Sequence, residues 1–262
     1  MTSRFWSLVL ICSLALVARP AATEEIHVVV SGGAAAAYKE LAPEFEQSTH
    51  HQLITVWGSS MGTTPGAVPM RLDRGEPLDV LIMVRDGVEP LIARGQVAPG
   101  SVVNIARSLI AMAVRAGAPV PDISNVAAFR RALLQAKSVA YSDSASGQYI
   151  SRELYQRLGI EQQMAGKSHM VPGTPVGEVV ASGQYELGFQ QFSELRPVAG
   201  IHIVGLIPAE LQKVTIYSAM LTTSAKAVAG GKQLIDFLKS PSAAGALKAS
   251  GLEPAGGDAD RH

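Results

Sequence analysis

The chain has 262 residues, of which 47% are hydrophobic and 17% charged, with 22 basic and 22 acidic side chains. This neutral balance excludes a protein that holds nucleic acid on a strongly basic surface. Any bound anion must therefore be held by local donors rather than by the overall charge. The length fits one large domain or two lobes, and the hydrophobic content is sufficient for a sizeable core.

The first 22 residues have the pattern of a cleavable secretory signal peptide. Arg4 supplies a positive charge, residues 6–17 form a short apolar run, and Ala21 and Ala22 are small residues at a cleavage zone. This run is shorter than the roughly 20 residues that a membrane-spanning helix needs. The sole cysteine, Cys12, would leave with the signal, which excludes disulfides, thiolate metal ligands and a cysteine nucleophile. An exported protein with a net charge of −2 is expected, because Arg4 and Arg19 are lost as well.

Short β-branched runs alternate with amphipathic stretches in the first part of the chain. We expect strands at residues 27–30, 53–57 and 78–84, and helices at residues 34–46, 68–74 and 87–94. This alternation predicts a parallel sheet with right-handed crossovers. The loops at the carboxyl ends of such strands form the natural ligand crevice, and here they are residues 31–33, 58–60 and 84–86.

A second set of elements follows and predicts a second lobe. Strands are expected at 109–114, 138–141 and 186–190, and helices at 127–135, 149–158 and 178–182. The chain then returns through a strand at 214–221 and ends in helices at 232–239 and 243–248. The predicted boundaries are 23–106 plus 214–250 for the first lobe, 107–213 for the second, and a flexible tail at 251–262.

Glycine and serine gather in three turns where a predicted strand leads into a helix, at residues 31–33, 58–60 and 142–147. Such turns offer free backbone N–H groups, hydroxyls and the positive end of a helix dipole, and they bind oxyanions or carboxylates. One turn of this kind is usually only a tight connection. Three of them indicate a shared anion site.

The order of five segments resembles the periplasmic molybdate-binding proteins of ABC transporters. The segments are SGGAAAAYKELAPEFEQ, GSSMG, LDRGEPLDVLIM, SVAYSDSASGQY and ASGQYELGFQQFSEL. The resemblance extends from about residue 26 to 250 and implies the two-lobed α/β fold of type II periplasmic binding proteins, each lobe a mostly parallel sheet flanked by helices. It also implies a periplasmic monomer whose lobes hinge over a small anion.

The resemblance assigns ligand contacts to residues of all three turns. These are Ser31, Gly33 or Ala34 in the first turn, Ser59 or Ser60 in the second, and Ser144, Ala145 and Ser146 in the third, where the family places backbone donors. Gln191 stands where molybdate binders commonly carry a ligand tyrosine, which is a departure from the family pattern. Arg85 follows the strand at 78–84 and could bind a carboxylate through two parallel hydrogen bonds. The other reading of Arg85 is a surface pair with Asp86 or Glu89.

Two functions remain open at this point. Within the family, the length and overall character most resemble the periplasmic aconitate isomerases, and this implies interconversion of trans- and cis-aconitate by an allylic proton shift that needs no cofactor. Such a shift needs an acid/base group, for which Tyr38, His169, Glu178 and Tyr149 are the candidates. The alternative is the substrate-binding subunit of an ABC transporter for a small oxyanion or carboxylate, with an ABC permease as its partner.

Other chemistries lack their sequence patterns. The chain has no HExxH motif, paired histidines or acidic cluster with ligand spacing, so no metal site is expected. GSSMG does not have the spacing of a nucleophile elbow, and nucleotide-binding fingerprints are missing as well, which disfavours serine hydrolysis and nucleotide chemistry.

Overall fold

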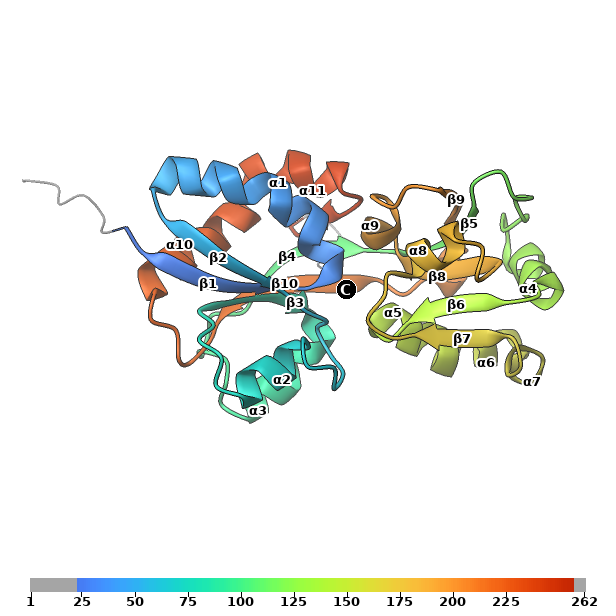
Figure 1. Ribbon diagram of the computed structural model, residues 1–262, viewed down its shortest axis with the longest axis horizontal. Coiled ribbons are helices and arrows are strands. Elements are labelled where there is room, and N and C mark those ends of the chain that lie inside the picture. Colours follow the sequence, from blue (N-terminus) through green and yellow to red (C-terminus); the bar gives the residue numbers. More distant parts are fainter. Residues whose placement is uncertain (1–22, 257–262) are drawn as a thin grey trace, which may run out of the picture.

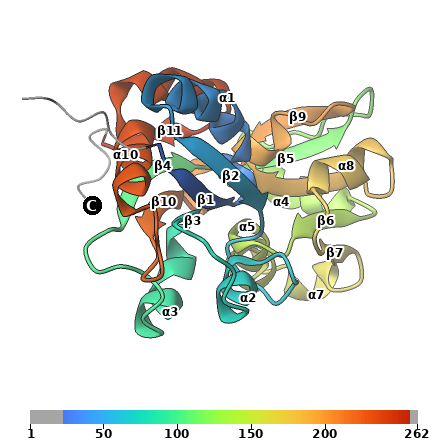
Figure 2. The same ribbon diagram turned by 60° about the vertical axis from the view of Figure 1, so that its left-hand side comes forward.

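The computed structural model describes residues 23–256, which form two lobes, each built on its own β-sheet (Figure 1). The predicted signal peptide and residues 257–262 lie outside the described residues. A view turned by 60° also places the lobes side by side (Figure 2). No helix between residues 23 and 256 is long and apolar enough to cross a membrane.

The first lobe holds a six-stranded sheet in the order β11-β4-β10-β3-β1-β2. Its strands are β1 (Glu25–Val30), β2 (Gln52–Trp57), β3 (Val80–Val84), β4 (Val103–Ser108), β10 (Thr215–Leu221) and β11 (Glu253–Pro254). Its helices are α1 (Gly32–Thr49), α2 (Val68–Asp73), α3 (Val88–Ala93), α10 (Val228–Lys239) and α11 (Ala244–Ala249). Strand β1 pairs in parallel with β2 and β3, whereas β10 runs antiparallel to β3 and β4.

Strand β1 explains why helices cover both faces of this sheet. Val28 and Val30 lie in the core formed with α1, α10 and α11, whereas Val29 lies in a separate core with Val68 of α2 and Val88 of α3. Successive residues of a strand face opposite sides, so a run of valines without polar residues is buried on both. Figure 1 shows α1, α10 and α11 on one face and α2 and α3 on the other.

The second lobe holds a five-stranded sheet in the order β7-β6-β8-β5-β9. Its strands are β5 (Ile110–Arg115), β6 (Val139–Ser142), β7 (Ser168–Val171), β8 (Leu187–Gln191) and β9 (Ile201–Leu206). Its helices are α4 (Val126–Gln135), α5 (Ala145–Tyr149), α6 (Tyr155–Leu158), α7 (Glu161–Met164), α8 (Val176–Ala181) and α9 (Phe192–Leu195), with a π-helical turn at Ile150–Leu154 joining α5 to α6. Strand β6 pairs in parallel with β7 and β8, and β5 runs antiparallel to β8 and β9.

The predicted two-lobed α/β fold is confirmed, although both sheets are mixed rather than mostly parallel. Strands β5 and β10 account for most of the antiparallel pairs. Each is the first strand after a passage of the chain between the lobes. Each therefore starts at the edge that faces the other lobe, where β1, β3, β6 and β8 end.

Four strands of the sheets were not expected from the sequence, namely β4, β7, β9 and the short β11. Strand β4 continues to Ser108, so residues 107 and 108 belong to the first sheet and not to the second lobe. Glu253 and Pro254, which we expected in a flexible tail, pair with Arg107 and Ala106 of β4. An ion pair of 2.6 Å between Arg107 Nε and Glu253 Oε2 adds to this contact.

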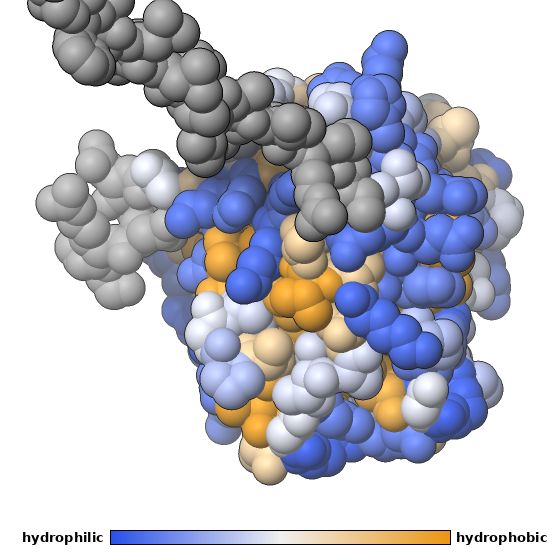
Figure 3. Space-filling model, turned by 90° about the vertical axis from the view of Figure 1, so that its left-hand side faces the viewer, coloured by the Kyte–Doolittle hydropathy of each residue, from blue (hydrophilic) through white to orange (hydrophobic). Residues whose placement is uncertain are grey.

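The end of the first lobe that faces away from the second lobe is mostly hydrophilic, with a few small hydrophobic patches (Figure 3). Single exposed apolar residues are usual on soluble surfaces and need no functional explanation. Three of the four buried side-chain atoms that have no hydrogen-bond partner among the described residues lie instead between the lobes.

Candidate functional site

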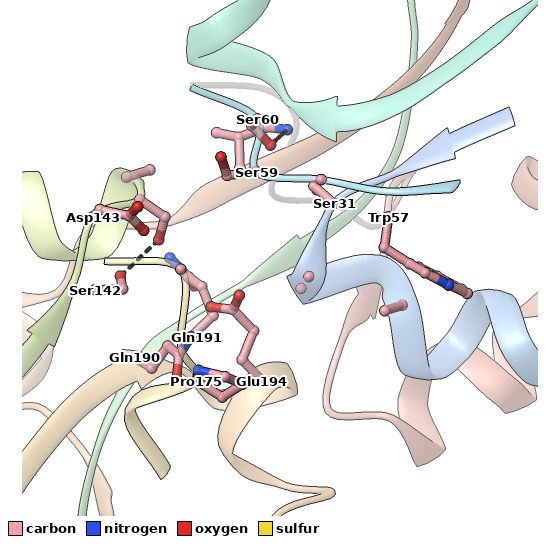
Figure 4. Close-up of a pocket in the computed structure, with 18 of the residues that line it drawn as sticks. Ser31, Trp57, Ser59, Ser60, Ser142, Asp143, Pro175, Gln190, Gln191 and Glu194 are labelled. Carbon is pink, nitrogen blue, oxygen red and sulfur yellow. Dashed lines mark hydrogen bonds between the residues drawn. The ribbon is translucent and has the colours of Figure 1, made fainter. Parts of the chain in front are cut away.

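A cavity of about 470 Å³ lies between the lobes and is lined by residues of both (Figure 4). Seven of the ten predicted contact residues line it: Ser31, Gly33, Ser59, Ser60, Ser144, Ala145 and Gln191. They come from the ends of β1, β2, β6 and β8, where the strands lead into turns or helices. The three predicted turns therefore meet at one place.

The first corner of the cavity is the junction of β1 and α1. Ser31 is the N-cap residue of α1, and its Oγ atom is buried and has no hydrogen-bond partner among the described residues. The first N–H groups of a helix have no partner within it, so Gly32 and Gly33 add two backbone donors. A Cβ atom at Gly33 would overlap the hydroxyl of Tyr217. Glycine is needed there because β10 approaches the helix so closely.

The second corner, after β2, differs from the first because its hydroxyls are already engaged. Ser59 Oγ donates to the carbonyl oxygen of Met61 at 2.8 Å, and Ser60 Oγ accepts from the N–H of Val84 at 2.9 Å. Ser60 thus ties this loop to the end of β3. Ser60 accepts this bond and keeps its own O–H as a donor, whereas Ser31 is the one first-lobe serine of the lining whose hydroxyl has no partner among the described residues.

The third corner lies between β6 and α5. Ser142 Oγ is 2.7 Å from Ser144 Oγ and 3.2 Å from Ser146 Oγ, so these hydroxyls bond to one another. Ser144 and Ala145 line the cavity, whereas Ser146 is buried beneath it. A Cβ atom at Gly147 would overlap the carbonyl oxygen of Ser142, so glycine permits the tight turn of the chain from strand to helix.

Arg85 lies outside the lining of the cavity and forms the surface pair that was its alternative reading. The chain forms a 3-10 turn at Arg85–Gly87, and the Arg85 guanidinium pairs with Glu89 Oε1 at 2.7 Å on the surface. Ala34, which directly follows Gly33 in α1, is the other predicted contact residue of the first lobe that lies outside the lining. An exposed pair of this kind, four residues apart on a helix, contributes little to stability.

None of the four candidate acid/base residues lines the cavity. Tyr149 is buried in α5, where its hydroxyl donates to the carbonyl oxygen of Leu211. Tyr38 is buried in α1, where its hydroxyl lies 3.0 Å from Thr55 Oγ1 and burial raises its pKa to about 12. His169 is exposed on β7 with its ring 5.7 Å from that of Tyr185. Glu178, in the first turn of α8, is exposed and lines a neighbouring cavity.

Two acidic residues that were not predicted from the sequence, Asp143 and Glu194, line the cavity, and Glu194 is the more deeply buried of them. It is the third residue of α9, and its Oε2 atom is buried without a hydrogen-bond partner among the described residues. Burial raises the pKa of the Glu194 carboxyl to about 7, against the lowering effect of hydrogen bonds from the Gln191 backbone and the Gln190 side chain. The negative charge of Asp143 raises it further. A glutamate three residues after a strand that ends at a crevice is the signal that could have identified it.

Lys39 is the basic side chain among the described residues that line the cavity. It is exposed on α1, and its Nζ lies 5.1 Å from the centre of the Trp57 ring. Trp57 ends β2 and keeps 43% of its surface exposed. The rim of the cavity therefore carries a positive charge next to an aromatic surface.

Unpartnered polar atoms are concentrated at this cavity. Among the described residues, four buried side-chain atoms have no hydrogen-bond partner, and three of them belong to Ser31, Gln191 and Glu194, which line it. Gln191 still donates through Nε2 to Thr215 Oγ1 at 2.7 Å. Buried polar atoms normally have hydrogen-bond partners. Three unpartnered atoms in one cavity therefore fit a binding site in which the ligand provides the missing partners.

No group of three or more His, Cys, Asp or Glu side chains within residues 23–256 is arranged to hold a metal ion. The donors that line the cavity are hydroxyls and backbone amides, which suit an anion.

Comparisons with known proteins agree with this geometry. The family model described as bacterial extracellular solute-binding protein matches residues 26–253. An aconitate isomerase from Pseudomonas sp is 48% identical over 239 residues, covering 91% of this chain and 90% of its own length. The molybdate-binding protein ModA of Azotobacter vinelandii is 26% identical over 254 residues, covering 93% of this chain and 96% of its own. The resemblance drawn from the sequence is confirmed.

Solved structures show the same fold. The periplasmic molybdate-binding protein of Azotobacter vinelandii has a TM-score of 0.71 at 23% identity and covers 87% of this chain and 98% of its own. PEB3 bound to L-phospholactate has a TM-score of 0.66 at 11% identity and covers 87% of this chain and 99% of its own. At these identities the similarity concerns the fold alone.

Proposed function

Since the chain belongs to the bacterial extracellular solute-binding proteins, we propose that its inter-lobe cavity binds a tricarboxylate and that the protein is an aconitate isomerase, converting trans-aconitate into cis-aconitate and back. The relative from Pseudomonas sp supports this function at 48% identity. The structural observation that carries it is the convergence of unpartnered polar atoms from both lobes on one cavity.

The chemistry of the reaction fits the hydroxyl and amide donors that line the cavity. Aconitate has three carboxylates around one C=C bond, and loss of a methylene proton leaves an anion that is delocalised over the allyl system and its carboxylates. Hydroxyls and amide N–H groups that are already in position stabilise such an anion without reorganisation. Return of the proton to the other end of the allyl system completes the isomerisation.

The geometry of the corners supports a set of substrate contacts. We propose that the Ser31 hydroxyl and the N–H groups of residues 32 and 33 bind one carboxylate, with the turns at 58–60 and 144–145 facing it across the cavity. Lys39, at the rim, would pair with a carboxylate that points outwards. Gln191 would contact the ligand in place of the tyrosine of molybdate binders.

The direct test is incubation of purified protein, residues 23–262, with trans-aconitate. We expect cis-aconitate to accumulate and to be measurable by chromatography, with the reverse reaction reaching the same ratio of isomers. Absence of turnover in both directions would contradict the isomerase function.

The alternative is the binding subunit of an ABC transporter, which the match to ModA favours. Arg85 does not distinguish the two functions, because it lies outside the cavity lining and pairs with Glu89. Tight calorimetric binding of molybdate, sulfate or a carboxylate without turnover would support this alternative and an ABC permease as partner. We further propose that the signal pattern of residues 1–22 directs export to the periplasm and that the mature protein is a monomer there. Size-exclusion chromatography of the mature protein tests the monomeric state.

Two serine variants separate ligand binding from folding. Ser31→Ala removes a hydroxyl that has no partner in the protein, so we expect stability close to that of the wild type and a KM for trans-aconitate that rises by roughly 10–100-fold, as for a lost hydrogen bond to a charged group. Ser60→Ala instead leaves the buried N–H of Val84 without an acceptor and should lower the free energy of unfolding by about 1–3 kcal/mol. Urea unfolding and steady-state kinetics check both. A destabilised Ser31→Ala protein with an unchanged KM would contradict the assignment.

A further inference from the structure

We infer that Glu194 is the catalytic base, which carries the proton from one allylic carbon of the substrate to the other. This inference rests on the proposed isomerase function and names the residue that performs its chemical step.

The position of Glu194 at the junction of the lobes is the first argument. A Cβ atom at Gly32 would lie 2.6 Å from Glu194 Oε1, so the carboxyl group extends from α9 in the second lobe to the start of α1 in the first. Figure 4 shows the side chain pointing into the space toward which Ser31 and Ser59 also project. A ligand held by the first corner would therefore lie beside this carboxyl.

The second argument is that the Glu194 carboxyl group can accept a hydrogen bond from the protein and still have one oxygen free. As the third residue of α9, Glu194 accepts a hydrogen bond from the backbone of the N-cap residue Gln191, as in one half of a capping box. This contact holds the carboxyl in place. Oε2 is buried and has no partner among the described residues, so it is available to take a proton.

The charged and titratable groups around Glu194 come from four elements. Asp143 projects from the β6–α5 corner and Tyr217 from β10, and both line the same cavity. Lys39 of α1 and Glu178 of α8 line the neighbouring cavity of about 650 Å³ that Glu194 also borders. Burial and Asp143 raise the pKa of Glu194 to about 7, and a base is most effective when its pKa lies near the working pH.

The step balances with one carboxyl group. Ionised Glu194 takes a proton from the methylene carbon of trans-aconitate, and the electron pair of the broken C–H bond enters the allyl system as the double bond shifts. The protonated carboxyl then returns the same proton to the former vinyl carbon, which gives cis-aconitate and regenerates the base. No net proton or electron is consumed.

The test is Glu194→Gln, which keeps the shape of the side chain and its ability to accept from Gln191 but cannot take a proton. We expect kcat to fall by about 10²–10⁴-fold, while calorimetry shows trans-aconitate binding within a few-fold of the wild type. The matched control is Glu161→Gln, because Glu161 is also in the first turn of a short second-lobe helix but is exposed and outside the cavity. Its activity should equal that of the wild type.

Stability provides a readout that does not depend on turnover. The folded protein favours neutral Glu194, since its pKa is raised from 4.5 to about 7, so stability is lost as the pH rises through this range. Glu194→Gln stays neutral and should melt several degrees higher than the wild type at about pH 8, with little difference at about pH 4.5. A helix-capping role alone would leave the melting temperatures of the variant and the wild type similar at both pH values, because glutamine can accept the same hydrogen bond from Gln191.

The outcomes separate the two proposals. If the wild type isomerises aconitate and Glu194→Gln does so at a similar rate, Glu194 is not the base and the isomerase function stands. If the wild type binds aconitate without turnover, the isomerase function fails and the base with it. Should the variant not fold, a wild-type kcat/KM that stays constant from about pH 5 to pH 8 overturns the inference.

Discussion

Wild-type kcat/KM for trans-aconitate is expected to fall about tenfold for each pH unit below about 7, and therefore about 100-fold by pH 5. The base is active only when it is ionised, and the ionised fraction of a group with a pKa of about 7 decreases by this factor in acid. The loss of rate between pH 7 and pH 5 depends on the raised pKa of Glu194. A carboxyl with the ordinary pKa of 4.5 would keep the rate almost unchanged down to pH 5.

Initial rates across this pH range, in buffers of constant ionic strength, measure the effect. Calorimetric binding of trans-aconitate at each pH is the control, since it separates weaker binding from loss of the base. The residual rate of Glu194→Gln should not follow the wild-type titration. A wild-type profile that stays flat down to pH 5 and breaks near pH 4.5 would contradict Glu194 as the base.

Gly147→Ala is expected to lower the free energy of unfolding by about 3 kcal/mol, because the added methyl group overlaps the backbone of Ser142 and not the end of a flexible side chain. For a chain of this size the loss corresponds to roughly 6–12 °C in the melting temperature. The displaced helix start would also move Ser144 and Ala145, so KM should rise in the fraction that folds. Calorimetric melting and steady-state kinetics measure both effects.

The matched control is Gly245→Ala in α11, where a Cβ atom would meet nothing within 4 Å. The same chemical change in an exposed helix should leave stability unchanged or raise it by up to about 1 kcal/mol. Equal stability of the two alanine variants would contradict the close contact between α5 and β6.

The turn that contains Gly147 also shows why the serine-rich turns could be recognised from the sequence alone. Short local patterns, a buried strand followed by glycine and serine and then a helix, are set by backbone conformation within a few residues. The type of fold and the location of the crevice at the carboxyl ends of the strands followed from repeats of this pattern. Strands β4, β7 and β9 were missed because polar residues and histidines interrupt their hydrophobic runs.

The sequence by itself determined that the chain forms two α/β lobes with anion-binding corners, because these features depend on local periodicity and turn chemistry. Only the tertiary structure decided which polar residues enter the cavity. Arg85 pairs with Glu89 on the surface, whereas Glu194 is brought against Gly32, which lies more than 160 positions earlier in the chain. The Glu194 carboxyl is buried, and its Oε2 atom left without a partner among the described residues, by contacts between the two lobes. Such contacts leave no pattern in the residues next to Glu194 in the sequence.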